Sequence, residues 1–321
     1  MDTQLKVGDT DEDTLVALLT AHLPPGDSTL VGPGDDAAVV ATSDGRFVVT
    51  TDVLVEGQHF RRQWSSGADV GVRAGVQNLA DVAAMGARPT ALVVAVTLPG
   101  DLPLEFVTGL ADGLAQVCRP LGVGVVGGDL SAGPVVTVAV TAHGDLEGRG
   151  PVLRSGARAG DAVAHAGVAG WSAAGLALLT ADLAGHDREL VAAYLRPSSP
   201  LAAGPAAARG SATSMLDVSD GLVRDARRIA TASGVCLELD DPADVFADDL
   251  ARLAPAATRL STTATTWVLG GGEDHGLLAT FPPGPLPDGF RKVGRVVTGS
   301  GVTVAGAPPP PSTAGWDHFS R

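Results

Sequence analysis

Hydrophobic and polar residues follow two different periods along this chain, and the change between them predicts where strands give way to helices. A period of two runs through RFVVTTDVLV, which predicts a strand whose end carries Thr50, Thr51 and Asp52. A period near 3.6 follows and predicts a helix that ends at Gly86. The apolar side of this helix consists of Val72, Val76, Leu79 and Ala83.

The same pattern divides the first half of the chain into alternating elements. After the first strand we expect a helix at 65–89, a buried strand at 90–99, a second helix at 103–122, and a pair of strands with a turn between them at 122–130 and 133–144. The N-terminal half therefore alternates between strand and helix.

Near residue 148 the chain becomes rich in turn-forming and charged residues, which predicts a boundary between domains 1–148 and 149–321. The second half predicts a helix at 171–183, a loop at 195–200, a strand, turn and helix at 214–235, a strand at 266–281, and a tail at 307–321 that starts as polyproline II.

Length and composition allow two domains with buried cores, since the chain has 321 residues and a hydrophobic content of 45%. Glycine, proline or a charge interrupts every apolar run before it reaches the length of a membrane span. The acidic N-terminus does not resemble a signal or transit peptide.

Cys118 and Cys236 are the only cysteines and lack metal-ligand spacing, so we interpret both as core residues of a cytoplasmic protein.

A formal net charge of −14 argues against a nucleic-acid partner, because no local basic stripe compensates for it. Lys6 and Lys292 are the only lysines, and neither stands in a G-x-x-x-x-G-K-[ST] motif. This excludes the P-loop NTPases and weakens any lysine-dependent chemistry.

The candidate chemistry lies in aspartates that stand near the ends of predicted elements. They are Asp35 and Asp36 before a strand, Asp52 at the end of one, Asp81 within a helix, Asp129 after VVGG, and Asp217 and Asp220 between a strand and a helix. Each alone has an ordinary explanation as a cap, turn or solvated residue. Together they favour a hard cation, Mg²⁺ first, because converging carboxylates need cations and Mg²⁺ typically bridges to phosphates.

Two further features are consistent with phosphate binding but have alternatives. Gly127 and Gly128 would let backbone amides approach a phosphate, or they could form a hairpin turn. Arg154 could bind a phosphate bidentately, or it could form a salt bridge between domains. The sequence leaves both alternatives open.

In order along the chain, the motifs resemble the thiamine-monophosphate kinase family of the aminoimidazole-ribonucleotide synthetase superfamily. They are GDDAAV, TTDVLVEGQHF, NLADVAAMGARP, GGDL, RSGARAGD, DVSDGL, GGEDHGLL and GWDHF. The resemblance implies Mg²⁺-dependent transfer of the ATP γ-phosphate to thiamine monophosphate, with several Mg²⁺ ions and with a monovalent-cation requirement left open. It also implies an α/β (α+β) subunit of two domains, of the aminoimidazole-ribonucleotide synthetase-like type, that forms a homodimer through its N-terminal sheet.

The resemblance implies roles for single residues as well. Metal ligands are matched by Asp36, Thr50, Thr51, Asp52, Asp81, Asp129, Asp217 and Asp220. ATP contacts are matched by Gly128, Asp129, Arg154 and Ser219, and contacts to thiamine monophosphate by His59, Glu273 and Trp316. Taken alone, His59 is typical of a loop histidine, Glu273 of a strand-end charge and Trp316 of a packing anchor. No general base is expected, because a phosphate acceptor with a second pKa of about 6 is already an ionised nucleophile.

One pair of residues departs from the family pattern. After GGED the family usually has an aromatic residue followed by glutamate, whereas this chain has His275 and Gly276. The departure makes the packing behind Glu273 an open question, and the predicted thiamine contacts depend on it.

Two rival interpretations come from different classes. Among other ATP-using members of the superfamily, selenophosphate synthetase carries a reactive cysteine and lysine near the N-terminus, whereas residues 1–34 hold no cysteine and only Lys6. An aminoimidazole-ribonucleotide synthetase would not be expected to show VEGQHF and GWDHF. The second rival is a non-catalytic module that binds Mg²⁺ and nucleotide and senses thiamine phosphates, against which the intact set of carboxylates argues.

Overall fold

The computed structural model describes residues 5–33 and 37–316, which form two compact units. Unit 1 runs to Gly148, except that Ala83–Ala87 belong to unit 2 together with the chain from Arg149 onward. The assignment of ATP binding to a domain 1–148, and of substrate contacts to a domain 149–321, stays a prediction.

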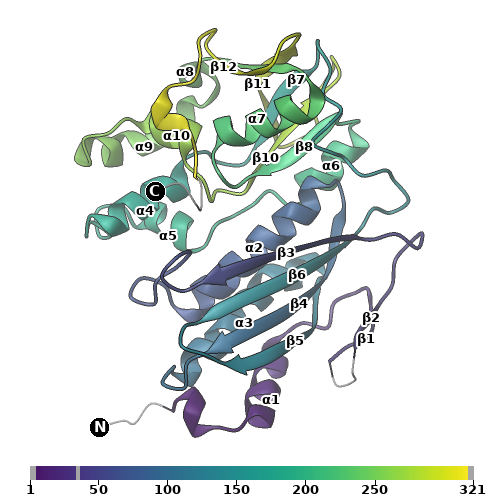
Figure 1. Ribbon diagram of the computed structural model, residues 1–321, viewed down its shortest axis with the longest axis vertical. Helices are drawn as coiled ribbons and strands as arrows, with labels where there is room; N and C mark the ends of the chain where they lie inside the picture. The colour runs from purple at the N-terminus through teal and green to yellow at the C-terminus, as the bar shows by residue number, and fades with distance from the viewer. Residues whose placement is uncertain (1–4, 34–36, 317–321) are drawn as a thin grey trace. The chain divides into compact units, whose positions relative to one another are not determined.

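Unit 1 is built on a four-stranded sheet in the order β3-β6-β4-β5 (Figure 1). Its strands are β3 (Val48–Val55), β4 (Arg88–Leu98), β5 (Gly124–Ala132) and β6 (Thr137–Asp145); a separate pair is β1 (Thr29–Val31) with β2 (Val39–Val40). Its helices are α1 (Glu12–His22), α2 (Gly67–Ala84) and α3 (Leu104–Cys118). The strands and helices expected between residues 46 and 144 are confirmed.

The pairing of the last two strands of this sheet differs from the prediction. We expected the strands at 122–130 and 133–144 to pair across a turn, but β5 and β6 are not neighbours. Strand β4 lies between them, parallel to β5 and antiparallel to β6. The crossover through α3 explains this, because a helix between two strands returns the chain parallel to the strand before it.

Helices α2 and α3 cover one face of this sheet with their backbones almost in contact (Figure 1). A Cβ on Gly71 would lie 2.1 Å from the carbonyl oxygen of Leu110, and one on Gly113 would lie 2.2 Å from that of Ala68. Glycine is therefore required at this crossing, and it draws both helices into one tightly packed layer.

Unit 2 contains a six-stranded sheet in the order β12-β9-β11-β7-β10-β8, in which only β12 and β9 are parallel. The strands are β7 (Ala162–Ala166), β8 (Ser214–Val218), β9 (Cys236–Leu239), β10 (Gly276–Phe281), β11 (Phe290–Val297) and β12 (Gly301–Val304). The helices are α4 (Trp171–Thr180), α5 (Arg188–Leu195), α6 (Ala203–Arg209), α7 (Leu222–Ser233), α8 (Pro242–Val245), α9 (Ala247–Arg259) and α10 (Ala264–Gly270). Alternate residues of β10 enter two different cores, Leu278 with α7 and Leu277 with α6.

One strand predicted in this half is shorter than expected. The segment 266–281 was expected to be a single strand, but its first part is helix α10 and only Gly276–Phe281 form β10. Trp267, Val268 and Leu269 are all buried in the core around α7. A short apolar run is compatible with a buried strand or a buried helix, and here tertiary packing selects the helix.

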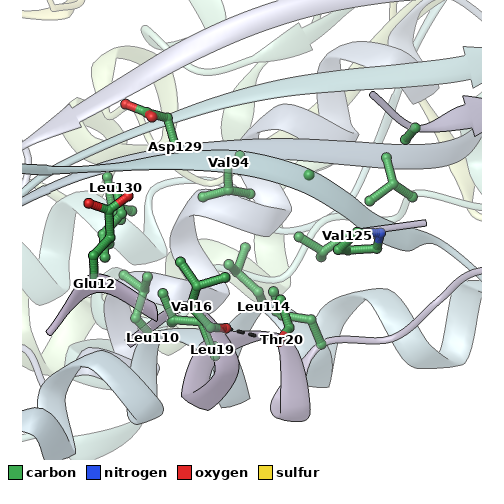
Figure 2. A pocket seen from close by; sticks show the side chains of 18 of the residues that line it. Glu12, Val16, Leu19, Thr20, Val94, Leu110, Leu114, Val125, Asp129 and Leu130 are labelled. Atoms are coloured by element: carbon green, nitrogen blue, oxygen red, sulfur yellow. Dashed lines mark hydrogen bonds between the residues drawn. The ribbon is translucent and has the colours of Figure 1, made fainter. Parts of the chain in front are cut away.

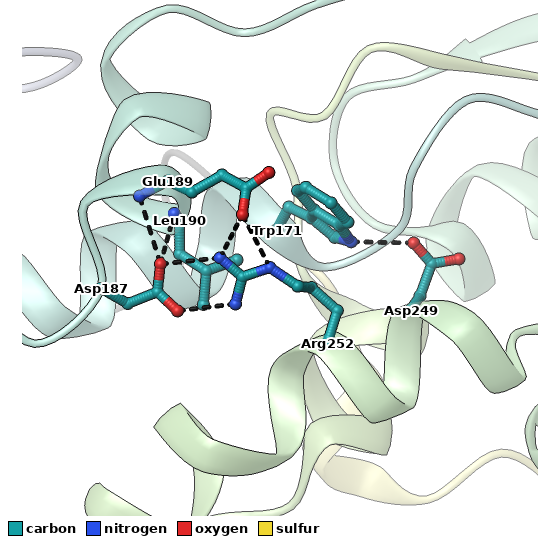
Figure 3. A network of polar contacts seen from close by, with 6 residues as sticks. All are labelled: Trp171, Asp187, Glu189, Leu190, Asp249 and Arg252. Carbon is teal, nitrogen blue, oxygen red and sulfur yellow. Dashed lines mark hydrogen bonds and ion pairs between the residues drawn. The ribbon is translucent and has the colours of Figure 1, made fainter.

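A polar network in unit 2 fixes the start of α4 (Figure 3). The indole Nε1–H of Trp171 donates to Asp249 Oδ1 at 2.8 Å, and the Arg252 guanidinium lies over the Trp171 ring, 5.4 Å from its centroid. Arg252 also donates to both carboxylate oxygens of Asp187, at 2.6 and 2.7 Å, and this holds the pKa of Asp187 below its usual range. Helices α4, α5 and α9 are thereby held in fixed positions.

The sequence predicted that both cysteines are core residues. Cys118 and Cys236 are both buried with free thiols, as predicted, and burial raises the pKa of the Cys118 thiol to about 12. Among the helices of the described residues, none combines the length and the apolar character needed to cross a membrane.

The glycine crossing yields a paired prediction. Gly71→Ala should lower the free energy of unfolding by about 1–3 kcal/mol, because the new methyl group overlaps the backbone of α3. Gly75→Ala, one turn further along α2, should stay within about 1 kcal/mol of wild type, because its Cβ would meet only the Val117 side chain, at 3.3 Å. Urea unfolding of both variants measures the difference, and equal stabilities would contradict the backbone contact.

Candidate functional site

Four of the predicted metal ligands of unit 1 come from β3 and α2. Thr50 Oγ1 donates a hydrogen bond of 3.0 Å to Asp81 Oδ2 on α2. Asp52 lies two residues further along β3, so its side chain points to the same face of the sheet as Thr50. The structure therefore brings Thr50, Asp52 and Asp81 to one face.

The other predicted ligands near them behave differently. Thr51 points to the opposite face, where its hydroxyl donates to the carbonyl oxygen of Val140 at 3.0 Å. Thr50, Thr51 and Asp52 all lie within β3. The expectation that Asp52 closes a strand is wrong, because pairing with β6 continues to Val55. Asp35 and Asp36 lie outside the described residues.

Asp129 stands apart from the Thr50 group. It pairs across β4 and β6 with Ala95, Ala139 and Val53, so it shares their face, which is the face opposite Asp52. Figure 2 shows its carboxylate on the side of β5 away from α1 and α3. Unit 1 by itself therefore does not bring Asp129 together with Asp52.

A cavity of about 300 Å³ lies beside β5, between α1 and α3 (Figure 2). Its lining is mainly apolar and includes Val16, Leu19, Leu110, Leu114, Val125 and Leu130, together with Glu12. Asp129 also borders the cavity, although its carboxylate lies on the other side of β5. Gly127 and Gly128 form part of the wall and lie within β5, so the hairpin-turn alternative for them is excluded. A Cβ on Gly128 would lie 2.0 Å from the carbonyl oxygen of Val94, which requires glycine there for a structural reason.

His59 follows β3 in a turn. Its Nδ1 accepts a hydrogen bond of 2.9 Å from the backbone N–H of Val55. The ring proton of the neutral form therefore sits on Nε2. The turn fixes both the tautomer and the orientation of the imidazole.

The predicted residues of unit 2 gather around the turn after β8. Asp217 is 7% exposed, and Ser219 and Asp220 follow it before α7 begins. The backbone N–H of Glu273 donates to the carbonyl oxygen of Ser219 at 2.8 Å, and that of Trp316 donates to the carbonyl oxygen of Asp220 at 2.9 Å. The Trp316 side chain is 56% exposed. The structure thus brings these five residues together from three distant segments.

Two residues of α7 that contact this turn were not identified from the sequence. Asp225 of α7 is fully buried and accepts the backbone N–H of Asp220 at 2.9 Å, and Arg228 forms ion pairs with both Asp220 and Asp225. Burial, together with the charges of Asp217 and Asp220, raises the pKa of Asp225 to about 7. The i, i+3 spacing of Asp225 and Arg228 at the start of an amphipathic helix was the available signal.

Arg154 does not join this group. It is exposed, and its carbonyl oxygen accepts a hydrogen bond from Ser233 Oγ at 3.2 Å. Ser233 ends α7, whereas Asp220 precedes its start, and a helix of 12 residues is about 18 Å long. The backbone of Arg154 therefore lies at the far end of α7 from the turn.

The donors of both units suit Mg²⁺ because they are all oxygen atoms. Within residues 5–33 and 37–316, no group of three or more His, Cys, Asp or Glu side chains is placed to hold a metal. Mg²⁺ at nucleotide sites is typically held by one or two carboxylates, waters and the substrate phosphates. Asp217 with Asp220, and Asp81 with Thr50, fit that kind of site better than a cage made by the protein alone.

Comparisons with known proteins give a consistent result. A family model described as AIR synthase related protein, N-terminal domain, matches residues 34–146. The chain is 47% identical to a thiamine-monophosphate kinase of Mycobacterium tuberculosis, over 92% of this chain and 87% of that protein. It is 43% identical to a thiamine-monophosphate kinase of Corynebacterium glutamicum, over 90% of this chain and 87% of that protein.

Solved structures agree. A structure described as "AaThiL complexed with AMPPCP and TMP" matches with a TM-score of 0.77. Its sequence identity is 31%, and the match covers 99% of this chain and 100% of that chain.

The buried carboxylate of α7 generates a prediction about stability. Asp225→Ala should lower the free energy of unfolding by about 1–3 kcal/mol, because it leaves the Asp220 N–H without its acceptor. Asp225→Asn keeps an acceptor oxygen and should lose less. Asp248→Ala, at an exposed position of α9, serves as the control and should stay within about 0.5 kcal/mol of wild type. A loss of the same size for Asp225→Asn and Asp225→Ala in urea unfolding would show that the acceptor oxygen contributes nothing.

Proposed function

This chain belongs to the thiamine-monophosphate kinase family, and we propose that it transfers the γ-phosphate of ATP to thiamine monophosphate, giving thiamine diphosphate and ADP. The observation that carries the proposal is 47% identity to a named thiamine-monophosphate kinase across 92% of the chain. The match over 99% of the chain to a relative complexed with AMPPCP and TMP supports the same pair of substrates.

The chemistry needs alignment of two polyanions more than it needs an acid or a base. The acceptor phosphate is already ionised at neutral pH, so it attacks the γ-phosphorus in line while ADP leaves. Mg²⁺, when bound, supplies neutralisation of the phosphate charge. The task of the protein is to hold and orient, and the all-oxygen donors of both units support that role.

The proposed roles follow the family match. We assign metal binding to Asp36, Thr50, Thr51, Asp52, Asp81, Asp129, Asp217 and Asp220, ATP contacts to Gly128, Asp129, Arg154 and Ser219, and thiamine-phosphate contacts to His59, Glu273 and Trp316. The grouping of Asp217, Ser219, Asp220, Glu273 and Trp316 around one turn supports the assignments in unit 2. We also propose the cytoplasm as the location, where ATP is available.

We further propose that a second copy of the chain covers the helix-free face of the unit 1 sheet. A sheet face that meets water normally carries polar residues, but Val49 and Val53 of β3 are 54% and 45% exposed. Beside Val53 on the same face lie Ala139 of β6 and then Ala95 of β4, whereas Val49 lies beside His143 of β6. Valine side chains this exposed on a sheet face support a subunit interface there, although Thr51 and Thr141 lie between them on the same face. Asp129 projects from this face, and we infer that its role depends on the second copy.

The activity itself is the first prediction of this proposal. The purified protein should convert thiamine monophosphate and ATP to thiamine diphosphate and ADP, lose the activity in EDTA and regain it with Mg²⁺. Unphosphorylated thiamine should not react, because its hydroxyl would need a general base. Chromatography of the products measures both reactions. Binding of both substrates without product would favour the sensor interpretation, and full turnover in EDTA would refute the metal assignments.

The interface is the second prediction. Val53→Glu should convert the dimer to monomers, because a buried charge at the centre of an apolar interface lacks a partner. Leu153→Glu changes a residue of unit 2 that is 47% exposed and should leave the dimer intact. Light scattering after size-exclusion chromatography reports the mass. A wild-type protein that runs as a monomer, or a dimeric Val53→Glu variant, would contradict the assigned face.

A further inference from the structure

The segment Glu273–His275 has an unusual backbone. Glu273 and His275 adopt φ values of 70° and 52°, in the left-handed region that residues with a Cβ seldom occupy. Two backbone hydrogen bonds hold them there: Glu273 N–H to Ser219 O at 2.8 Å, and His275 N–H to Val218 O at 3.1 Å. Such a conformation persists only where the surroundings impose it.

Asp274, between these two residues, anchors the segment from the other side. Its carboxylate accepts the backbone N–H groups of Gly170 at 2.5 Å and Ser172 at 2.8 Å, at the start of α4. Asp274 is buried, and burial raises the pKa of its carboxyl to about 7. With Asp274 held at the start of α4, Glu273 and His275 project toward the turn after β8.

The His275 imidazole consequently lies between two carboxylates. Its Nδ1 is 3.5 Å from Asp217 Oδ2, the long limit of a hydrogen bond, and its Nε2 is 3.9 Å from Glu273 Oε2. The His275 side chain is 5% exposed and that of Glu273 is 39% exposed. One buried ring therefore spans from a proposed metal ligand to a proposed substrate contact at the surface.

The residue after His275 is glycine, and the buried side chain of His165 lies directly beside it. A Cβ on Gly276 would lie 2.8 Å from His165 Nε2 and 2.7 Å from the carbonyl oxygen of Ala166. His165 is fully buried, and burial together with the Arg291 charge lowers its pKa to about 3, so the ring is neutral. It also packs edge-on against Phe246, with 5.5 Å between the ring centroids. His165 thus fills the space that a side chain at position 276 would need, which accounts for glycine at that position.

We propose that His275 is a positioning residue that fixes Asp217 and Glu273 relative to each other, and so links the binding of Mg²⁺ to that of thiamine monophosphate. The inference rests on the proposed function for the roles of these two carboxylates. The geometry itself, with one ring nitrogen facing each carboxylate, belongs to this chain. Groups that orient metal ligands in this way typically change metal affinity or activity about 10–100-fold when they are removed.

The two ring nitrogens can be tested separately. In His275→Asn the amide group replaces Nδ1 and keeps the contact with Asp217, whereas in His275→Gln it replaces Nε2 and keeps the contact with Glu273. His275→Phe, which restores the aromatic residue usual in the family, loses both. His186→Phe, at an exposed position of the same unit, is the matched control.

Four quantities are measured for each variant: the Mg²⁺ concentration for half-maximal activity, the KM for thiamine monophosphate, kcat, and the rise in melting temperature caused by Mg²⁺ without substrates. His275→Phe should raise the first by about tenfold or more, raise the KM, and reduce the Mg²⁺-induced rise. His275→Asn should change mainly the KM, and His275→Gln mainly the Mg²⁺ requirement. His186→Phe should match wild type in all four.

Two outcomes would overturn the inference. One is a His275→Phe enzyme whose Mg²⁺ requirement and KM equal those of wild type. The other is an equal loss in all three variants that follows melting temperature alone, which is the behaviour of a purely structural residue. A wild-type protein that does not phosphorylate thiamine monophosphate would refute the proposed function instead, and the Mg²⁺-induced stabilisation would still test the link between His275 and Asp217.

Discussion

The repulsion between neighbouring carboxylates is the constraint on which the turn after β8 depends. Burial, together with the nearby charges of Asp217 and Asp220, raises the pKa of Asp225 to about 7, and two of these three carboxylates are buried. Arg228 and the backbone N–H of Asp220 offset this repulsion. A buried charge without such a partner would be strongly destabilising. The first turns of α7 therefore hold Arg228, whose positive charge balances the carboxylates of the site.

Local periodicity was sufficient to predict the elements whose partners lie close in sequence. Helices α2 and α3 carry a sustained apolar period, and β3 and β4 are long enough to be recognised. The order of the strands was less accessible, because the placement of β4 between β5 and β6 follows from the crossover through α3, which local periodicity does not reveal. The same limit applies to α10, whose apolar run became helical only through packing in the core around α7.

The candidate site was predictable in composition but not in arrangement. Oxygen donors beside glycines indicated a phosphate and Mg²⁺ chemistry, yet Asp52 and Asp129 proved to lie within strands and on opposite faces of one sheet. A one-residue change of register reverses the face of a side chain, so no spacing argument could have separated them. His165 and the N-terminus of α4 act through contacts between segments that lie far apart in the chain, and no local motif marks them. Asp225 differs, because its i, i+3 spacing to Arg228 is visible in the sequence.

The contacts around the two proposed ligands of unit 2 share one feature. Arg228 and Arg224 both approach Asp220 through Oδ2, and His275 approaches Asp217 through Oδ2 as well. In each carboxylate, the protein thus uses one oxygen for orientation and these contacts leave the other, Oδ1, for a ligand. A cation could then bind without displacing the arginine, so the turn would keep its counter-charge before, during and after each catalytic cycle. Rigid support of a ligand through its second oxygen reduces the reorganisation that binding requires. A kinase without a general base depends on holding its metal ligands in place, and buried polar contacts around their carboxylates serve that purpose.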